Sequence, residues 1–285
     1  MFKISTFLLC SFITSIALAD NVILMIGDGM GANHLQCSAE GKPLYLTALP
    51  TKGWVQTRSA NNIVTDSAAS ATAYSCGQKT NNYFLGKLPD KTDCFTIAEE
   101  AVEKGYGVGI YSTDHPTGAT PSAFYAHTTN RHDKKTIEQD KKKATQSMDI
   151  AVPVKKISSE ITPRLTKLSA GQGKKGFFAM FEGAKIDTES HKNNFEAMKK
   201  ELYDFDYAVM KASNYVQEHP DTTLIVLADH ETGGLTDDCR YTSKNHTVVD
   251  IPLHAYGKHA KLFEGVQDNT EIYHKIKSIL FSENE

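Results

Sequence analysis

The stretch Asn21-Val-Ile-Leu-Met-Ile26, followed at once by Gly27-Asp28-Gly29, decides the fold of this chain. The apolar run is too short for a surface helix and ends in a glycine turn, so it is typical of a strand buried on both faces. Asp28 is therefore expected at the carboxyl end of a buried strand. In open sheets of parallel strands, functional side chains gather at that end.

Apolar runs of the same kind recur along the chain and alternate with helical patterns. Helices are predicted at residues 95–104, where Gly105 follows as a stop signal, and at 193–217, where apolar residues recur at three-to-four spacing. A Lys-rich polar stretch at 132–175 predicts a solvated loop with a helix or two. Strands alternating with helices predict an α/β fold, with a mostly parallel central sheet and helices on both faces. Further strands are predicted at residues 108–112, 176–181, 222–228 and 251–255.

The first 19 residues have the features of a secretory signal peptide. Met1-Phe2-Lys3 is basic, an apolar segment follows from Ile4 to Ile16, and Ala17-Leu18-Ala19 fits a signal-peptidase site. The apolar segment falls short of the about 20 residues that a membrane span needs. We therefore expect a signal peptide at 1–19, one large α/β domain at 20–285, and a secreted or periplasmic protein without a membrane span.

Charge and cysteine content limit the classes of partner and site. The formal net charge is −3, so no basic face for nucleic acid is expected. Four cysteines remain after the predicted cleavage and lack the CxxC clustering of metal sites, which favours disulfides or buried thiols in an oxidising compartment. The sequence does not choose among the possible pairings. The residues are Cys37, Cys76, Cys94 and Cys239.

A second informative stretch is Thr65-Asp66-Ser67-Ala-Ala-Ser-Ala-Thr72, in which a serine follows an acidic residue and opens a run of small, helix-compatible residues. A serine at this place lies at a helix N-terminus, where free N–H groups and the helix dipole favour an anion. Its hydroxyl can attack a phosphoryl group if another group lowers its pKa. Metal ions bound at the predicted strand ends are suited to that role.

Carboxylate and imidazole side chains occur in several other segments. Asp187 and His191 are four residues apart, so at the start of a helix both lie on one face and can bind one ion. Asp229-His230 follows a predicted strand, and His246 supplies another imidazole. Carboxylate with imidazole suits zinc, whereas carboxylate with hydroxyl suits magnesium. Each segment alone is more often a capping or surface feature, but the set together is hard to explain in that way.

These segments, taken together and in this order, resemble the alkaline phosphatase family. As a group they are highly specific. The resemblance implies an alkaline-phosphatase-like fold and an enzyme that hydrolyses phosphate monoesters through a phosphoserine intermediate. The matching runs extend from the first predicted strand to the last: Val22–Gly31, Thr65–Thr72, Ala119–His127 with Arg131, Glu182–His191, Ala228–Gly234 and His246-Thr247.

The resemblance also implies roles for individual residues. It implies two Zn²⁺ and one Mg²⁺, with Ser67 as the nucleophile beside one zinc and Arg131 as a bidentate clamp on two phosphate oxygens. The ligands of one zinc would be Asp187, His191 and His246. The ligands of the other zinc would be Asp28, Asp229 and His230. The ligands of the magnesium would be Asp28, Thr120 and Glu182.

Two features of this chain depart from the family pattern. Gly118 stands where relatives usually carry an Asp or His that helps to hold the third metal, so magnesium binding is expected to be weakened. Asp114 and His115 belong to the same loop, but their offset along the chain argues against either of them as a replacement. The chain is also short in residues 131–182 and leaves no room after His230 for the crown insertion of relatives. We therefore expect a shortened member of the family, and its oligomeric state stays open.

Two alternatives to a phosphomonoesterase stay open. A phosphodiesterase of the same superfamily would use a similar site, but Arg131 favours a phosphate with two free oxygens and hence a monoester. A non-catalytic metal- or phosphate-binding protein would fit the short middle segment and Gly118. Against that alternative, a decayed enzyme is expected to lose some ligand, and every zinc position is filled. The expected partners are therefore small-molecule phosphate monoesters.

Overall fold

The computed structural model describes residues 20–171 and 174–281, so the predicted signal peptide lies outside the described residues. Its elements alternate along the chain as an α/β fold requires. The strands are β1 Asn21–Gly27, β2 Thr51–Gln56, β3 Gly107–Ser112, β4 Asp149–Ala151, β5 Phe177–Gly183, β6 Thr222–Leu227, β7 Ile251–Gly257 and β8 Gly265–Asp268. The helices are α1 Ala32–Ser38, α2 Ser67–Cys76, α3 Ile97–Glu103, α4 Ala119–Ser122, α5 Lys134–Ala144, α6 Ile157–Ser169, α7 Lys185–His191, α8 Phe195–Glu218 and α9 Asn269–Phe281, with short 3₁₀ helices at Leu46–Ala48 and Ala260–Phe263.

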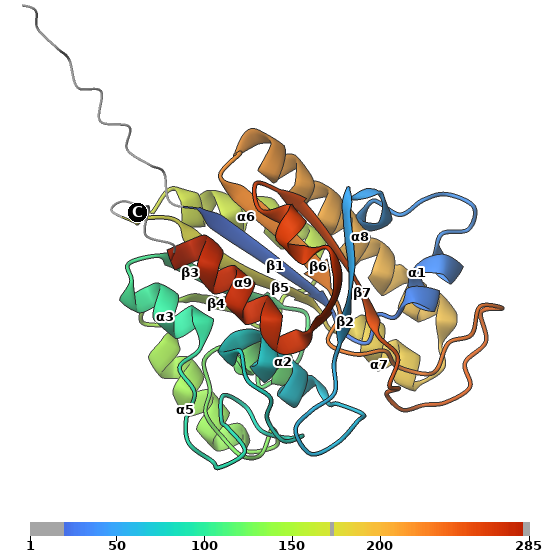
Figure 1. Ribbon diagram of the computed structural model, residues 1–285, viewed down its shortest axis with the longest axis horizontal. Helices are drawn as coiled ribbons and strands as arrows, with labels where there is room; N and C mark the ends of the chain where they lie inside the picture. The colour runs from blue at the N-terminus through green and yellow to red at the C-terminus, as the bar shows by residue number, and fades with distance from the viewer. Residues whose placement is uncertain (1–19, 172–173, 282–285) are drawn as a thin grey trace, which may run out of the picture.

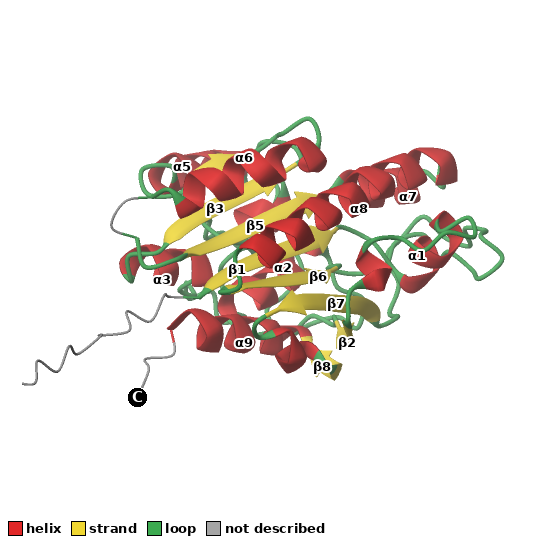
Figure 2. Ribbon diagram, turned by 90° about the horizontal axis from the view of Figure 1, so that it is seen from above, coloured by secondary structure: helices red, strands yellow, loops and turns green. Residues whose placement is uncertain are grey.

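The strands form one sheet in the order β4-β3-β5-β1-β6-β7-β2-β8, and they lie side by side in Figure 2. Neighbours from β4 to β6 pair in parallel, and β2 pairs in parallel with β8. Only β7 runs against its two neighbours, β6 and β2. The prediction of a mostly parallel sheet is therefore confirmed.

Helices cover both faces of this sheet, as predicted. In Figure 1, α2 and α9 lie on one side of β1, and α6 and α8 lie on the other. The helix α6 packs on α8, β3 and β5, while α9 packs on α2 and β1. Because both faces are covered, the central strand has no polar side: every residue from Val22 to Ile26 is fully buried.

Most of the predicted elements are present with small shifts of their ends. The strands predicted at 108–112, 176–181 and 222–228 are β3, β5 and β6, and the run at 251–255 is β7. The predicted helices are α3, which a Thr96–Glu99 capping box starts, and α8. The elements that periodicity did not reveal include β2 and β8 at one edge of the sheet.

Residues 132–175 are more ordered than the sequence predicts. The two helices expected there are α5 and α6, but α6 buries one face, with Ile161 and Leu165 fully inaccessible. The same segment also contributes β4, which pairs with β3 at the other edge of the sheet. The expectation of a solvated loop is therefore wrong for α6 and β4. The lysines that dominate this stretch lie on outer faces and hide the apolar pattern.

Four cysteines form two disulfides, which settles the pairing that the sequence left open. Cys37 of α1 is bonded to Cys239, so the loop between β6 and β7 is fastened to α1. Cys76, the last residue of α2, is bonded to Cys94 just before α3. Each bond therefore restrains a segment that carries candidate site residues. Among the described residues, no helix has the length and apolar character to cross a membrane.

Candidate active site

The helix α2 presents Ser67 at its first turn. The N-terminal cap is Asp66, whose Oδ1 accepts a hydrogen bond from Ala69 N at 3.0 Å. The side chain of Ser67 is almost fully buried, and its Oγ lies 3.2 Å from Nε2 of His230. The Tyr74 hydroxyl donates to the carbonyl of Ala228 at 2.6 Å, which ties α2 to the end of β6. The serine is therefore fixed relative to the strand end that carries Asp229 and His230.

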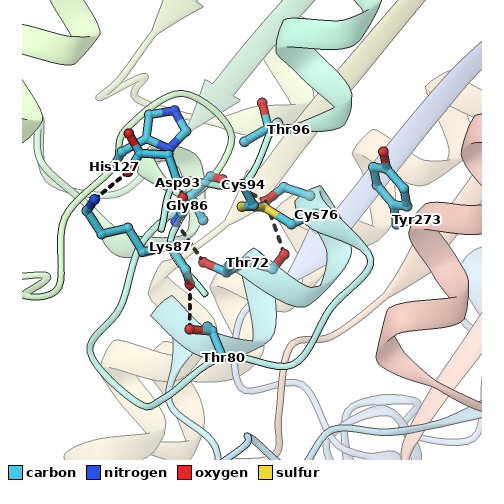
Figure 3. Close-up of a disulfide and its surroundings, with 12 residues drawn as sticks. Thr72, Cys76, Thr80, Gly86, Lys87, Asp93, Cys94, Thr96, His127 and Tyr273 are labelled. Carbon is cyan, nitrogen blue, oxygen red and sulfur yellow. Dashed lines mark hydrogen bonds and ion pairs between the residues drawn. A yellow bond between two sulfur atoms is a disulfide. The ribbon is translucent and has the colours of Figure 1, made fainter. Parts of the chain in front are cut away.

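The far end of α2 is held as firmly as its start. Figure 3 shows the Cys76–Cys94 disulfide there, beside Thr72 on the same helix. Gly86 N donates to Thr72 Oγ1 at 3.2 Å, and Thr72 Oγ1 donates to a carbonyl of the same loop. Gly77 ends the helix with a φ of +71°, in the left-handed region that favours glycine. The loop 77–94 thus packs along α2 and fixes the direction of the helix.

The first metal-binding cluster stands beside Ser67 and consists of Asp28, Asp229 and His230. Nε2 of His230 lies 3.2 Å from Asp229 Oδ2 and 3.6 Å from Asp28 Oδ1. These two carboxylate oxygens are buried and have no hydrogen-bond partner. The other oxygen of Asp229 accepts from the backbone N–H groups of Gly29 and His230, at 3.1 and 3.0 Å. The carboxylate is therefore aimed by the backbone, with one oxygen left for a cation.

The second cluster consists of Asp187, His191 and His246. The two imidazole Nε2 atoms lie 3.2 Å apart, and Asp187 Oδ1 is 3.3 Å from the first and 3.7 Å from the second. The ring of His246 also stacks on the ring of His230, with centroids 3.5 Å apart. The two clusters are thus contiguous. Two imidazole nitrogens that face each other and one carboxylate form a typical set of zinc donors.

Hydrogen bonds on the outer side of these imidazoles leave Nε2 free to bind a metal. Nδ1 of His246 faces the carbonyl of Thr65 at 3.0 Å, and Nδ1 of His191 faces the carbonyl of Lys244. A carbonyl can only accept, so both Nδ1 atoms donate, and both Nε2 atoms face Asp187 Oδ1. Thr232 bridges the two clusters, because its hydroxyl donates to Asp187 Oδ1 at 2.5 Å and lies 3.2 Å from His230 Nδ1.

The third cluster contains oxygen atoms only. Glu182 ends β5 next to Asp28 at the end of β1, and Thr120 comes from α4. Glu182 and Thr120 are fully buried, and Glu182 Oε1 and Thr120 Oγ1 have no hydrogen-bond partner. The other carboxylate oxygen of Glu182 accepts from the hydroxyl of Ser112. This set of donors is the one that Mg²⁺ prefers.

The site contains several buried carboxylates close to one another, and this arrangement favours bound cations. Burial raises the pKa of Asp28 well above its usual range, and the charges of Asp229 and Asp187 raise it further. Burial also raises the pKa of Glu182, and it raises the pKa of Asp229 to about 6 with help from the charge of Asp187. The pKa of His230 is lowered, first by burial, so its imidazole is neutral. Crowded buried carboxylates beside neutral imidazoles fit divalent metal ions, which would offset the charge.

Arg131 reaches the same end of α2 from the loop before α5. Its Nη1 donates to Asp66 Oδ2 at 3.1 Å, and its backbone N–H donates to the carbonyl of Tyr83. Asp66 thus has two tasks, because one oxygen caps the helix and the other holds the guanidinium. Arg131 remains partly exposed and lies near the turn that carries Ser67. A guanidinium beside a helix N-terminus is suited to binding a phosphate group.

All ten residues that the sequence singled out therefore meet at the carboxyl edge of the sheet. This is the signature of one family, and the family model described as alkaline phosphatase matches residues 19–162, 158–241 and 235–281. The chain belongs to the alkaline phosphatase family. It spans about three fifths of the length of the curated relatives that it matches first.

Members of the alkaline phosphatase family are similar to this chain in sequence and in structure. The alkaline phosphatase of Schizosaccharomyces pombe is 29% identical over 82% of this chain and 61% of its own length. Alkaline phosphatase 3 of Bacillus subtilis is 27% identical over 75% of this chain and 61% of its own length. The structure of alkaline phosphatase from the Antarctic bacterium TAB5 superposes with a TM-score of 0.81 at 28% identity, covering 92% of this chain and 98% of that chain. A mutant of the TAB5 enzyme has Mg bound in its M3 site.

The sequence assigns no role to three further residues of the candidate site. Asp66 stands out in the sequence only as the acidic neighbour of Ser67, and Thr232 is one residue of a matching run. The offset of Asp114 from Gly118 along the chain argues against it. The first two act through hydrogen bonds that no spacing rule reveals, although an N-cap role for Asp66 could have been read from its position before a helix.

Proposed function

We propose that this chain is a zinc-dependent phosphomonoesterase that works through a phosphoserine formed on Ser67. The observation that carries this proposal is the position of Ser67 Oγ, 3.2 Å from His230 Nε2 at the first turn of α2. A buried hydroxyl between a helix N-terminus and a metal-binding cluster has the surroundings that an activated nucleophile needs. The match to the alkaline phosphatase family supports the same reaction.

The donor sets support two zinc ions and one magnesium ion. The two clusters that contain imidazole would hold zinc, and the cluster of Asp28, Thr120 and Glu182 would hold magnesium. The Mg bound in the M3 site of the TAB5 mutant supports the third assignment. When bound, these ions would act as Lewis acids that lower the pKa of the Ser67 hydroxyl and neutralise charge on the phosphate.

The residues of the chain bind the phosphate and exchange its ester bond. Arg131 and the free N–H groups at the start of α2 hold the phosphate oxygens. Deprotonated Ser67 Oγ attacks phosphorus, the bond to the leaving oxygen breaks, and the leaving alcohol takes up a proton. Water then attacks the phosphoserine, phosphate leaves, and Ser67 is restored. Asp66 acts as a positioning residue, because it holds the guanidinium and caps the helix at once.

We further propose that the protein works outside the cytoplasm. Two disulfides within the described residues support an oxidising compartment, since such bonds are rare where thiols are kept reduced. The secretory signal predicted at residues 1–19 points the same way.

The replacement of Ser67 by Ala tests the proposed function. We expect hydrolysis of an aryl phosphate monoester to fall by about a thousandfold or more, because the covalent step is lost. Zinc content, measured by elemental analysis, should stay at two per chain, since the remaining ligands are untouched. The matched control is Ser70→Ala, one turn further along the same buried helix, which should keep its activity. Undiminished hydrolysis by zinc-loaded S67A would refute the proposal.

A comparison of substrates tests the preference for monoesters. Arg131 matches a phosphate with two free oxygens, so turnover of an aryl phosphate monoester should exceed that of the matching diester. Arg131→Ala should reduce the rate for the monoester more than for the diester. Faster turnover of the diester would assign the site to a phosphodiesterase, and zinc binding without any hydrolysis would indicate a binding protein.

A further inference from the structure

The third cluster, formed by Asp28, Thr120 and Glu182, contains buried oxygen atoms without a hydrogen-bond partner. Thr120 Oγ1, Glu182 Oε1 and Asp28 Oδ1 are all buried without a hydrogen-bond partner. Groups of this kind are costly to bury unless something binds them. They come from three elements, α4, β5 and the turn after β1. β1 and β5 pair up to Gly27 and Gly183, so Asp28 and Glu182 lie at neighbouring strand ends.

Position 118, at the start of α4, contributes no side chain. The backbone there has φ −57° and ψ 146°, a conformation open to every residue, so glycine is not required by the backbone. The constraint is space. A Cβ at position 118 would lie 2.0 Å from Asp114 Oδ2 and 2.4 Å from its Cγ. The carboxylate of Asp114 thus occupies the volume that a side chain at position 118 would fill.

The loop 113–118 holds Asp114 in this place. The backbone N–H of Asp114 donates to Ser112 Oγ at 2.8 Å, and the same hydroxyl donates to Glu182. Asp114 Oδ1 accepts from His115 N at 2.6 Å, and Gly118 N closes a turn onto the His115 carbonyl at 2.8 Å. This turn brings Asp114 back beside Gly118. The offset along the chain, which argued against Asp114 at the sequence level, is therefore no obstacle in space.

The negative charge of Asp114 acts on the carboxylates of the third cluster. After burial, it is the largest cause that raises the pKa of Glu182, and it also contributes to the raised pKa of Asp28. The neighbouring imidazole does not compete for this place. His115 is exposed, and its Nδ1 lies near the N–H and the hydroxyl of Thr117, at 3.3 and 3.1 Å. Asp114 is thus the loop residue that extends the third cluster.

We propose that Asp114 supplies the carboxylate of the third metal site in place of a side chain at position 118, and that it keeps this site selective for magnesium. The proposal rests on the proposed function, which places a metal ion between Asp28, Thr120 and Glu182. Mg²⁺ keeps several of its waters in proteins, so a carboxylate at the rim of the site holds the ion by accepting hydrogen bonds from them. With Asp114 the site offers only oxygen donors, which favour Mg²⁺ over Zn²⁺.

Direct binding of Mg²⁺ to the zinc-loaded protein tests this role without reference to substrate. Isothermal titration of the wild type should show one Mg²⁺ per chain. Asp114→Asn keeps the shape of the side chain and the acceptor for His115 N, but removes the charge. It should weaken Mg²⁺ binding about 10- to 100-fold, the usual effect of losing such an outer partner. His115→Ala, in the same loop, is the matched control and should bind Mg²⁺ as the wild type does.

Moving the carboxylate sharpens the test. In Asp114→Gly the volume beside position 118 becomes free, because the Cβ of Asp114, 2.8 Å from a Cβ at position 118, is removed with the carboxylate. Gly118→Asp in the same chain can then place a carboxylate there from the other position. The double variant should recover most of the Mg²⁺ affinity that D114G alone loses. Melting temperature and zinc content serve as measures of folding. A merely structural role of Asp114 would instead change stability and leave Mg²⁺ affinity intact in folded D114N.

Several outcomes would overturn the proposal. They are wild-type Mg²⁺ affinity in D114N, no recovery in the double variant, or no Mg²⁺ binding by the zinc-loaded wild type. Failure of the proposed function gives a different result, because it appears as undiminished hydrolysis by S67A. Weakened Mg²⁺ binding in D114N would stand even then, since the titration contains no phosphate ester.

Discussion

The two sides of the site differ in the chemistry of their donors. Toward α7 and the loop after β6, three imidazoles touch one another, and carboxylates stand between them. Toward α4, the buried groups without a hydrogen-bond partner are hydroxyl and carboxylate oxygens, from Thr120, Glu182 and Asp28. Asp28, at the end of the central strand, takes part in both sides. One strand end can thus serve a borderline metal and a hard metal, because the elements on its two sides bring different donors.

The strongest test of this difference between the two sides is to remove the metal ions and add them back one at a time. Chelation should lower hydrolysis by on the order of a thousandfold or more, because the proposed activation of the Ser67 hydroxyl depends on bound metal. Zinc alone should restore much of the activity, and magnesium alone should restore none. Kinetics with an aryl phosphate and elemental analysis of each sample measure this. Activity with magnesium as the sole metal would contradict the assignment of the imidazole clusters.

The two disulfides extend the same comparison to stability. Cys37–Cys239 fastens the loop that leads to His246 and spans 202 residues, whereas Cys76–Cys94 spans 18 residues at the end of α2. Loop-closure entropy predicts a loss of about 5 kcal/mol for the first bond and about 3 kcal/mol for the second when both cysteines are changed to serine. Urea denaturation measures both losses.

Zinc binding separates the two disulfide variants further. Loss of Cys37–Cys239 should weaken zinc binding, because the loop that carries His246 is freed, whereas loss of Cys76–Cys94 should leave zinc affinity nearly unchanged. Equal zinc affinity in the two variants would show that the loop keeps its position without the bond.

The central strands and their ends could be predicted because burial of each strand determines its own short run of residues. A run such as Val22 to Ile26 is apolar throughout, since both faces of the sheet are covered, and the polar residue that follows it must stand at the edge. β2 escaped prediction for the opposite reason. Its residues alternate between buried and exposed, but Gly53 stands at a buried position and Trp54 at an exposed one, so the apolar pattern does not follow the alternation. β4, with three residues, is too short to show any period.

The candidate site was predictable in its residue types but not in its contacts. The motifs name Ser67 and the metal-binding residues, yet nothing in the sequence shows that Thr232 bridges two clusters or that Asp66 holds Arg131. Disulfide pairing depends on distances between remote segments. Asp114 was rejected because its spacing was judged along the chain, whereas the turn of its loop returns it to Gly118.

Thr232 offers a finer test of the imidazole side. Its hydroxyl donates to Asp187 Oδ1 and lies 3.2 Å from His230 Nδ1, so it orients one ligand from each cluster. Thr232→Val keeps the shape and removes both contacts. Zinc affinity, measured by competition with a chelator, should fall about 10- to 100-fold, as for other outer partners of metal ligands. Thr242→Val, in the same loop but exposed, is the control; equal zinc affinity in the two variants would remove Thr232 from the site.

The smallest effect is expected at a buried histidine that is not one of the site residues. His254 of β7 pairs with Lys52 of β2 and is buried. Burial, and then the charge of Lys52, lowers the pKa of His254 from 6.5 to about 4. Above pH 6.5 the imidazole is neutral in the folded and the unfolded chain. As the pH falls below 6.5, His254 becomes protonated in the unfolded chain but stays neutral in the folded chain. The free energy of unfolding therefore falls until the pH reaches about 4.

Protonation of His254 in the unfolded chain should lower the free energy of unfolding of the wild type by about 2 kcal/mol at pH 5 relative to pH 7. His254→Gln should remove that part of the pH dependence, and His132→Gln, at an exposed position, should not. Urea denaturation of the wild type and the two variants at pH 5, 6 and 7 measures how the free energy of unfolding of each protein changes with pH. Because His254 is not one of the metal-binding residues, the effect should persist in zinc-loaded protein, whereas acid sensitivity that arises in the site depends on metal. A pH dependence that His254→Gln leaves unchanged would place the titrating group in the site instead.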